Sequence, residues 1–481
     1  MMRKLSRAIA ALGLAAALAV PAAAAPKAKY VFLFIGDGMA LAQINSAAVY
    51  ANAMSSKEIA IKPLGFSKLP VSGLTTTHDA SSFITDSASA GTAMATGNKT
   101  LSGVINMDPG KTVKYRTIAE EAKALGMKVG IVSSVSIDHA TPASFYAKVP
   151  SRSDYYAIGE QLAASGFDYF GGGGFLQPKG KKGDQAELTE LAAKAGYKVV
   201  AGKERIMALR KGSGKVLAVE SLLQDASALH YDMDRPAGAA SLADFTRVGI
   251  ELLGDAPKGF FMMVEGGKID WACHANDAAS SIKDTLAFDA AVSEALAFMA
   301  KHPKETLIVV TGDHETGGMS IGFAGTQYST FFDKVAKQTM SFQRFNDEVV
   351  KPYKDKAKKD EADLADLLPA IKAAFGLELG DLTPLQQNEL QFAFNRTMGN
   401  QVVRAAAEDA YLLYGGYEPL TVKLTQILNQ AAGIGWTSYA HTGVPVATFA
   451  KGSGQELFGG LYDNTDIYRK LCSAMGIQKK N

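Results

Sequence analysis

Short apolar runs alternate with amphipathic segments along most of this 481-residue chain. Runs rich in valine, isoleucine and phenylalanine predict buried strands at residues 30–35, 128–135, 198–201, 216–219, 259–264, 306–311 and 444–450. Between them, apolar positions with a helical period predict helices at 117–125, 184–195, 240–253 and 278–300. This alternation predicts an α/β fold, a largely parallel central sheet with helices on both faces.

The pattern changes from about residue 326 to residue 435. Long charged side chains at helical spacing dominate there, for example in 351–361 and 363–374. We therefore expect a mainly helical insertion at 326–435, placed before the last strand, with its charges on a solvated face. The α/β core would then be formed by residues 26–325 and 436–481.

Two glycine-rich runs are candidates for phosphate-binding loops. Residues 171–174 are all glycine, and 212–215 read Gly-Ser-Gly-Lys. The second run lacks the upstream glycine of a P-loop. We expect the first to be a turn and the second a loop before a strand.

The N-terminus has the pattern of a secretory signal. Arg3, Lys4 and Arg7 precede an apolar run at 8–20, and small residues follow to Ala25. This predicts a cleaved signal peptide at residues 1–25 and export to a bacterial periplasm or beyond. No later segment is long and apolar enough to span a bilayer.

The mature chain is close to neutral. The whole chain has 50 basic and 48 acidic side chains, and cleavage removes three of the basic ones, leaving 47. Binding that is specific for nucleic acids is therefore not expected, because there is no basic field to support it. The two cysteines, Cys273 and Cys472, could form one disulfide, and their spacing leaves that pairing open.

Residues 85–93 read Thr-Asp-Ser-Ala-Ser-Ala-Gly-Thr-Ala and predict a tightly packed helix that starts at Ser87 and stops near Gly97. Phe83 and Ile84 lead into it as an apolar, strand-like segment. The N–H groups and dipole at a helix N-terminus suit a bound phosphate. Taken alone, however, such a serine is more often a helix cap than a nucleophile.

Carboxylates and histidines gather in five other short segments. These are Gly36–Met39, Asp138–Pro142 (followed by Arg152), Glu265–His274, Thr311–Glu315 and Tyr439–Gly443. Of the seven histidines, four lie inside these segments: His139, His274, His314 and His441. We interpret the other three, His78, His230 and His302, as surface or structural residues.

Several of these acids follow predicted strands. Asp37, Glu265 and Asp313 come at or just after the ends of apolar runs, where parallel sheets collect functional groups. Asp270 and His274 are four residues apart, so one helical turn would place both on one side. Imidazole and carboxylate groups suit zinc, and oxygen ligands suit magnesium.

The ordered set of motifs resembles the alkaline phosphatase family over nearly the whole mature chain. The resemblance implies that Ser87 is the nucleophile, that Arg152 grips the phosphate and that Asp86 orients Arg152. It implies a first zinc ion held by Asp270, His274 and His441. A second zinc ion would be held by Asp37, Asp313 and His314, together with the Ser87 oxygen.

The resemblance also implies a third cation, usually magnesium. Asp37 would bridge to it, and Thr141 and Glu265 would complete it. His139 stands near this site, at a position where some relatives have aspartate, and Trp271 lies where relatives vary between basic and aromatic residues. Two zinc ions about 4 Å apart can hold both the entering and the leaving oxygen of an in-line displacement.

The implied function is an exported phosphomonoesterase that hydrolyses small phosphate monoesters through a phosphoserine intermediate. Two alternatives are a phosphodiesterase or sulfatase on a related metal site and a noncatalytic periplasmic phosphate-binding protein. The Cys/Ser-x-Pro-x-Arg signature of sulfatases is absent. Relatives are often homodimers, and the 326–435 insertion would be crown- or lid-like, serving substrate access, dimer contact or stability.

Overall fold

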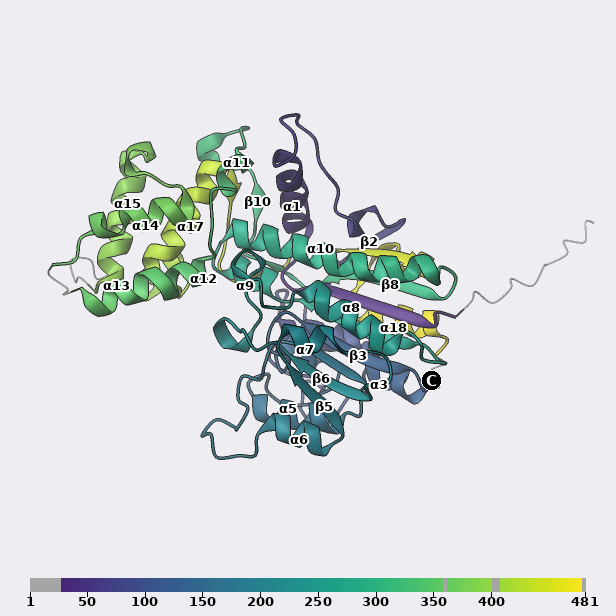
Figure 1. Ribbon diagram of the computed structural model, residues 1–481. Coiled ribbons are helices and arrows are strands. Elements are labelled where there is room, and N and C mark those ends of the chain that lie inside the picture. Colours follow the sequence, from purple (N-terminus) through teal and green to yellow (C-terminus); the bar gives the residue numbers. More distant parts are fainter. Residues whose placement is uncertain (1–26, 358–360, 400–406, 478–481) are drawn as a thin grey trace, which may run out of the picture.

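The computed structural model describes residues 27–357, 361–399 and 407–477. The predicted signal peptide lies outside these residues. A ten-stranded sheet forms the centre, with strand order β14-β2-β13-β8-β1-β7-β3-β4-β6-β5 (Figure 1). The predicted α/β fold is therefore confirmed.

The core of the sheet is parallel. Its strands are β1 (Tyr30–Gly36), β3 (Lys128–Ser133), β4 (Tyr169–Gly172), β5 (Tyr197–Ala201), β6 (Lys215–Val219), β7 (Phe260–Gly266) and β8 (Thr306–Gly312). At one side, β13 (Val446–Gly452) runs antiparallel to both β8 and β2 (Val71–Thr76), and β14 (Gly460–Asp463) lies parallel to β2. Crossover connections that contain helices join the parallel strands, as such sheets require.

Strand β1 is buried on both faces, which explains its continuous apolar run. Tyr30, Phe32 and Phe34 pack into one core with α1 (Leu41–Ala53), α7 (Lys203–Met207), α8 (Leu242–Leu253) and α10 (Ala278–Lys301). Val31 and Leu33 pack into the opposite core with α2 (Ser87–Thr96), α3 (Ile118–Ala124), α4 (Ala140–Ala143), α5 (Tyr155–Ala164), α6 (Leu188–Lys194) and α18 (Asn464–Met475). Helices therefore cover both faces.

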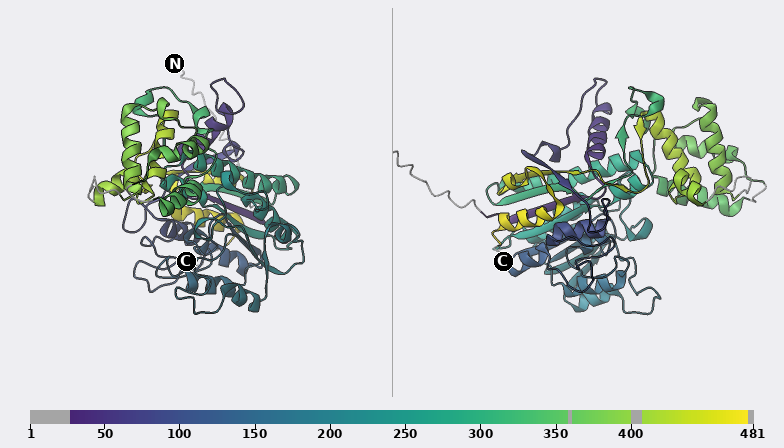
Figure 2. Two further views of the ribbon diagram at one scale, coloured as in Figure 1. Left: turned by 60° about the vertical axis from the view of Figure 1, so that its left-hand side comes forward. Right: turned by 180° about the vertical axis from the view of Figure 1, so that it is seen from behind.

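A group of helices stands to one side of the sheet (Figures 1 and 2). Its members are α11 (Phe332–Val335), α12 (Phe342–Phe345), α13 (Lys351–Lys356), α14 (Leu368–Phe375), α15 (Pro384–Thr397), α16 (Ala407–Tyr414) and α17 (Pro419–Ala432). Phe375, Phe394 and Leu424 belong to a separate apolar cluster within it. Prolines at the first turns of α15 and α17, each after an extended N-cap residue, favour the helix starts.

Several predicted boundaries were wrong. Both β13 and β14 follow the helical group, so it does not precede a single last strand. The predicted strand at 444–450 begins only at Val446, and the predicted helix at 184–195 begins only at Leu188. Phe83 and Ile84 lie in no strand, and Phe83 is 89% exposed.

Three strands of the sheet were not predicted. β2 and β14 are partly exposed strands at one end of the sheet, so they lack a continuous apolar run. β4 ends in Gly171 and Gly172, where the glycine run predicts a turn instead. The Gly-Ser-Gly-Lys segment does lead into a strand, as predicted, because β6 starts at Lys215.

The two cysteines do not pair with each other. Cys273 belongs to the core on one face of the sheet, and Cys472 belongs to the core on the other face. The open question is thus settled in favour of two buried thiols. Across the described residues, we find no helix with the length and apolar character needed to cross a membrane.

Candidate active site

The register of the central strands brings three acidic residues to one edge of the sheet. Gly36 at the end of β1 lies opposite Gly266 of β7 and Gly312 of β8. Glu265 therefore lies beside the end of β1, and Asp37 and Asp313 follow two neighbouring strand ends. All three carboxylates are buried. The expected gathering of acids at the carboxyl edge is confirmed.

Helix α2 carries Ser87 as its first residue. Asp86 caps the helix by accepting a hydrogen bond from the Ser89 N–H at 3.0 Å, and Gly97 ends it with a φ of 73°. A Cβ at Gly91 would lie 2.8 Å from the Ser144 Cβ. The small residues of α2 thus allow its close approach to α4, and the helix start near Ser87 agrees with the prediction.

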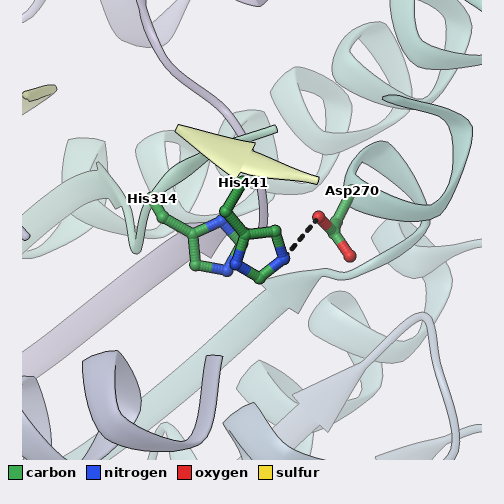
Figure 3. Close-up of side chains that lie close together, drawn as sticks. All are labelled: Asp270, His314 and His441. Carbon is green, nitrogen blue, oxygen red and sulfur yellow. Dashed lines mark ion pairs between the residues drawn. The ribbon is translucent and has the colours of Figure 1, made fainter. Parts of the chain in front are cut away.

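Asp270 lies between two histidines from different parts of the chain. On helix α9 (Lys268–His274), the His274 Nε2 is 3.3 Å from the Asp270 Oδ2. The His441 Nε2, from β12 (His441–Thr442), is 3.7 Å from the Asp270 Oδ1 and 3.2 Å from the His274 Nε2. Figure 3 shows Asp270 facing His441, whose ring stacks on His314 at 3.6 Å.

A second group surrounds the His314 Nε2. This nitrogen is 3.3 Å from the Asp37 Oδ1, 3.2 Å from the Asp313 Oδ2 and 3.2 Å from the Ser87 Oγ. Potential metal-ligand atoms of Asp37, Asp313 and His314 all lie within 4.8 Å of one another. His314 is within the same range of Asp270 and His441, so the first two groups adjoin each other.

Three imidazole rings are fixed through their Nδ1 atoms. The His274 Nδ1 faces the Tyr439 carbonyl oxygen at 2.5 Å, and the His441 Nδ1 faces the Thr85 carbonyl oxygen at 2.8 Å. A carbonyl oxygen only accepts, so both Nδ1 atoms carry the hydrogen. Their Nε2 atoms are left to point into the site, which is the arrangement typical of metal-binding histidines.

The third ring, that of His314, is held by Thr316. The Thr316 hydroxyl donates its hydrogen to the Asp270 Oδ1 at 2.5 Å. It can therefore only accept from the His314 Nδ1, which is 3.3 Å away. The His314 Nε2 lone pair then faces the oxygens of Asp37 and Asp313, and a cation between them would satisfy all three atoms.

Asp37 also joins a third group with His139 and Glu265. The Thr141 hydroxyl donates to the Asp37 Oδ2 at 3.5 Å, and the Ser133 hydroxyl donates to the Glu265 Oε2. His139 differs from the other three histidines, because its Nε2 must accept from the Arg152 guanidinium at 3.3 Å.

The buried acids show where positive charge is needed. Burial and the charge of Asp313 raise the pKa of Asp37 well above its usual range, and burial and Asp270 do the same to Asp313. Burial also raises the pKa of Glu265 to about 7. The Asp37 Oδ1, the Asp313 Oδ2 and the Glu265 Oε1 are buried without a hydrogen-bond donor. Divalent cations would supply both missing ligands and charge.

Histidine titration supports the same interpretation. Burial lowers the pKa of His314 well below its usual range, and it also lowers that of His441, so both rings offer a neutral nitrogen. Burial lowers the pKa of His274 too, but Asp270 more than offsets this and raises it to about 9. At His274 a proton and a cation therefore compete for one Nε2.

Arg152 projects into the same site. Its Nη1 lies 2.9 Å from the Asp86 Oδ2. Burial raises the pKa of Asp86, but Arg152 and hydrogen bonds from Ser89 more than offset this and lower it to about 2. Burial and the nearby Arg152 lower the pKa of His139 to about 3, so that ring is neutral. The structure thus brings every predicted site residue into one contiguous cluster.

Several supporting residues could not be predicted from the sequence. Thr316 fixes His314 and Asp270, and Ser133 holds Glu265. Gln43 donates to the Glu315 Oε1 at 2.7 Å, which anchors the segment after Asp313 and His314. None of these three has a motif of its own. Their roles depend on contacts across the fold, such as the pairing of β9 (Glu315–Thr316) with β12.

A helix-covered parallel sheet with a serine at the start of a helix, and with buried carboxylate and imidazole groups at its carboxyl edge, has the architecture of a metal-dependent hydrolase. The family model for alkaline phosphatase matches residues 28–477. The chain belongs to the alkaline phosphatase family, and it is a phosphoric monoester hydrolase.

Two curated relatives come from Bacillus subtilis (strain 168). The chain is 31% identical to alkaline phosphatase 3 over 93% of its own length and 89% of that protein. It is 33% identical to alkaline phosphatase 4 over 91% of its own length and 86% of that protein. The homology therefore covers nearly the whole chain.

Solved structures agree. The cold-active alkaline phosphatase from a psychrophilic Shewanella sp. superposes with a TM-score of 0.76 at 29% identity, covering 93% of this chain and 99% of that one. The alkaline phosphatase from Thermus thermophilus superposes with a TM-score of 0.78 at 25% identity, covering 95% of this chain and 93% of that one.

Removing divalent cations should make stability fall as the pH rises from about 7 to about 9. Glu265, whose pKa is raised to about 7, and His274, whose pKa is raised to about 9, then hold protons in the folded chain that the unfolded chain has released, so each rise in pH through this range favours unfolding. His314 and His441 are neutral in both states there. Urea unfolding of chelator-treated protein should show a drop of about 1–3 kcal/mol across this window.

The control is the same protein with zinc and magnesium restored. Cations replace the protons on these groups, so the drop should shrink or reverse. Equal slopes with and without cations would contradict the interpretation that the buried acids need them.

Proposed function

We propose that this enzyme transfers the phosphoryl group of small phosphate monoesters to Ser87 and then to water. The observation that carries the proposal is the position of Ser87. Its hydroxyl sits at the N-terminus of α2 and contacts the His314 Nε2, around which Asp37 and Asp313 converge. The covalent step forms a bond from the Ser87 oxygen to phosphorus and breaks the bond to the leaving alkoxide; the hydroxyl proton of Ser87 goes to solvent, and the alkoxide takes up a proton from solvent. In the second step the oxygen of a water molecule bonds to phosphorus, the bond to the Ser87 oxygen breaks, and the serine takes up a proton as inorganic phosphate leaves.

The residues of the chain bind and orient the substrate in this scheme. The Arg152 guanidinium pairs with two nonbridging oxygens, which its planar fork suits and a lysine could not reproduce. Asp86 holds Arg152 in place at 2.9 Å. Free N–H groups in the first turn of α2 donate to the same phosphoryl oxygens.

We propose that two zinc ions and one magnesium ion occupy the three ligand groups. Asp270, His274 and His441 would hold the first zinc ion, and Asp37, Asp313 and His314 the second. Asp37, Thr141 and Glu265, with His139 nearby, suit magnesium because oxygen dominates that set. When bound, the zinc ions would activate the serine and stabilise the leaving oxygen, and magnesium would add positive charge.

Ser87→Ala is the direct test of the covalent step. We expect Ser87→Ala to lower kcat by about 10³-fold or more, because the other residues of the site cannot replace the lost nucleophile. Mass spectrometry after acid quenching with substrate should detect a phosphoryl group on the peptide that contains Ser87 in the wild type and not in the variant. Ser473→Ala, on the surface of α18, is the control and should keep full activity. An active Ser87→Ala enzyme would contradict the proposal.

The remaining rival is a phosphodiesterase on the same type of site. The family match favours a hydrolase over a noncatalytic phosphate-binding protein. Arg152, which pairs with Asp86 beside Ser87 in the chain, and the third group, which shares Asp37 with the second, favour a dianionic monoester. We therefore expect kcat/KM for a phenyl phosphate monoester to exceed that for the matching methyl phenyl diester and for phenyl sulfate by at least about 10²-fold, measured with one preparation. A diester hydrolysed as efficiently as the monoester would favour the rival.

We further propose export to the periplasm or beyond, supported by the basic and apolar pattern of residues 1–25. Residues 326–435 would form the crown- or lid-like insertion between the two core segments, 26–325 and 436–481. The separate apolar cluster of its helices supports that division.

A homodimer is supported by exposed apolar side chains near α1, including Ile59 and Ile61.

A further inference from the structure

A fully buried lysine lies behind the active site. Lys268, the first residue of α9, has 0% of its side chain exposed. Its Nζ is 2.6 Å from the Asp225 Oδ1, and it lies 3.7 Å from the ring centre of Tyr231 and 4.7 Å from that of Trp271. The ammonium group thus joins a carboxylate to two aromatic faces.

These contacts continue toward the proposed phosphate site. Trp271 also contacts His139. The centres of the two rings are 5.6 Å apart and the ring planes meet at 74°, which is an edge-to-face arrangement. The His139 Nε2 in turn accepts from the Arg152 Nη2 at 3.3 Å. An unbroken series of contacts therefore runs from Asp225 through Lys268 to Arg152.

The turn that supplies Asp225 reaches His139 by a second route. Ala226 and Ser227 adopt positive φ angles of 48° and 57°, which cost energy for residues with a side chain. In this conformation the Ser227 carbonyl accepts from the Gly174 N–H at 2.8 Å. The Gly174 carbonyl accepts from the Ile137 N–H at 2.9 Å, two residues before His139.

Stability alone does not account for this arrangement. The Lys268 ammonium is fully buried while the side chain of Asp225 is 22% exposed, and burying a charge beside such a partner is often no better for stability than burying an apolar side chain of similar size. A methionine at position 268 could fill the same space without desolvating a charge. The turn is strained as well, and strain of this kind is found where geometry matters for function.

We propose that Lys268 is a positioning residue that sets phosphate affinity by holding Trp271 against His139 and thereby fixing Arg152. The inference rests on the proposed role of Arg152 in binding phosphate. Lys268 touches neither substrate nor the reacting atoms. Its effect should therefore appear in binding of phosphate more than in the chemical step.

The test compares Lys268→Met and the milder Asp225→Asn with the wild type, all as metal-loaded enzyme. We expect the inhibition constant of inorganic phosphate and the KM for p-nitrophenyl phosphate to rise by about 3- to 10-fold, with kcat changed by less than about 2-fold. Lys423→Met is the matched control, because Lys423 is also buried and paired, with Glu389 at 3.5 Å, within the helical group. It should leave both constants unchanged. Unchanged constants in Lys268→Met and Asp225→Asn would overturn the inference.

Tryptophan fluorescence tests the contact between Lys268 and Trp271 directly. The chain has two tryptophans, so Trp436→Phe leaves Trp271 as the sole reporter. In that background, Lys268→Met should raise acrylamide quenching of Trp271 fluorescence by about 1.5-fold or more, because the ring loses the ammonium that holds it. Lys423→Met should not. Identical quenching in all three proteins would show that Lys268 does not position Trp271.

Arg152→Ala separates this inference from the proposed function. If Arg152→Ala raises the phosphate inhibition constant and Lys268→Met does not, only the positioning role of Lys268 fails. If Arg152→Ala leaves that constant unchanged, the proposed role of Arg152 fails, and with it the basis of the inference. If both Arg152→Ala and Lys268→Met raise the phosphate inhibition constant, adding Lys268→Met to Arg152→Ala should raise that constant little further.

Discussion

The structure depends on the electrostatic compensation of carboxylates that the sheet forces together. The in-register ends of β1, β7 and β8 place Asp37, Glu265 and Asp313 side by side in a buried space. Like charges in such a space repel, and burial makes each charge costly. Protons can compensate part of this below the raised pKa values of these groups, and divalent cations can do so at higher pH as well. On this account, divalent cations held by the three groups would stabilise the local fold as well as serve the chemistry.

Neutral hydrogen-bond acceptors fix the orientation of the histidine rings in the same site. Carbonyl oxygens of Thr85 and Tyr439 fix His441 and His274 through Nδ1, and Thr316 fixes His314. Tyr439 also links the site to the helical group, because its hydroxyl donates to the Leu413 carbonyl of α16 at 2.5 Å. Through this tyrosine, the placement of α16 bears on the orientation of His274. The helical group therefore has a physical route by which it can influence the metal ligands.

The sequence was sufficient to predict the elements in which local pattern and final environment agree. The continuous apolar runs of β1, β7 and β8 and the small-residue helix that starts at Ser87 are of this kind. So is the gathering of carboxylates and imidazoles into the three groups, because their residues lie in short motifs along the chain. The family resemblance supplied the grouping of those residues around particular cations.

Features that depend on contacts between distant segments could not be predicted in this way. β4 ends in two glycines, and β2 and β14 are half exposed, so their strand identity comes from their neighbours. Thr316 and Lys268 look like ordinary residues until β9 pairs with β12 and α9 packs against the turn at Asp225. The exposure of Phe83 likewise reflects the path of the loop before α2, which its apolar character did not reveal.

The central claim is that the three buried groups hold divalent cations that compensate their carboxylates. Elemental analysis of purified enzyme, calibrated against its activity toward a phosphate monoester, tests it most directly. The account predicts about three cations per fully active chain, two of zinc and one of magnesium, with activity lost as the zinc content falls. A fully active enzyme with less than one divalent cation per chain would contradict it.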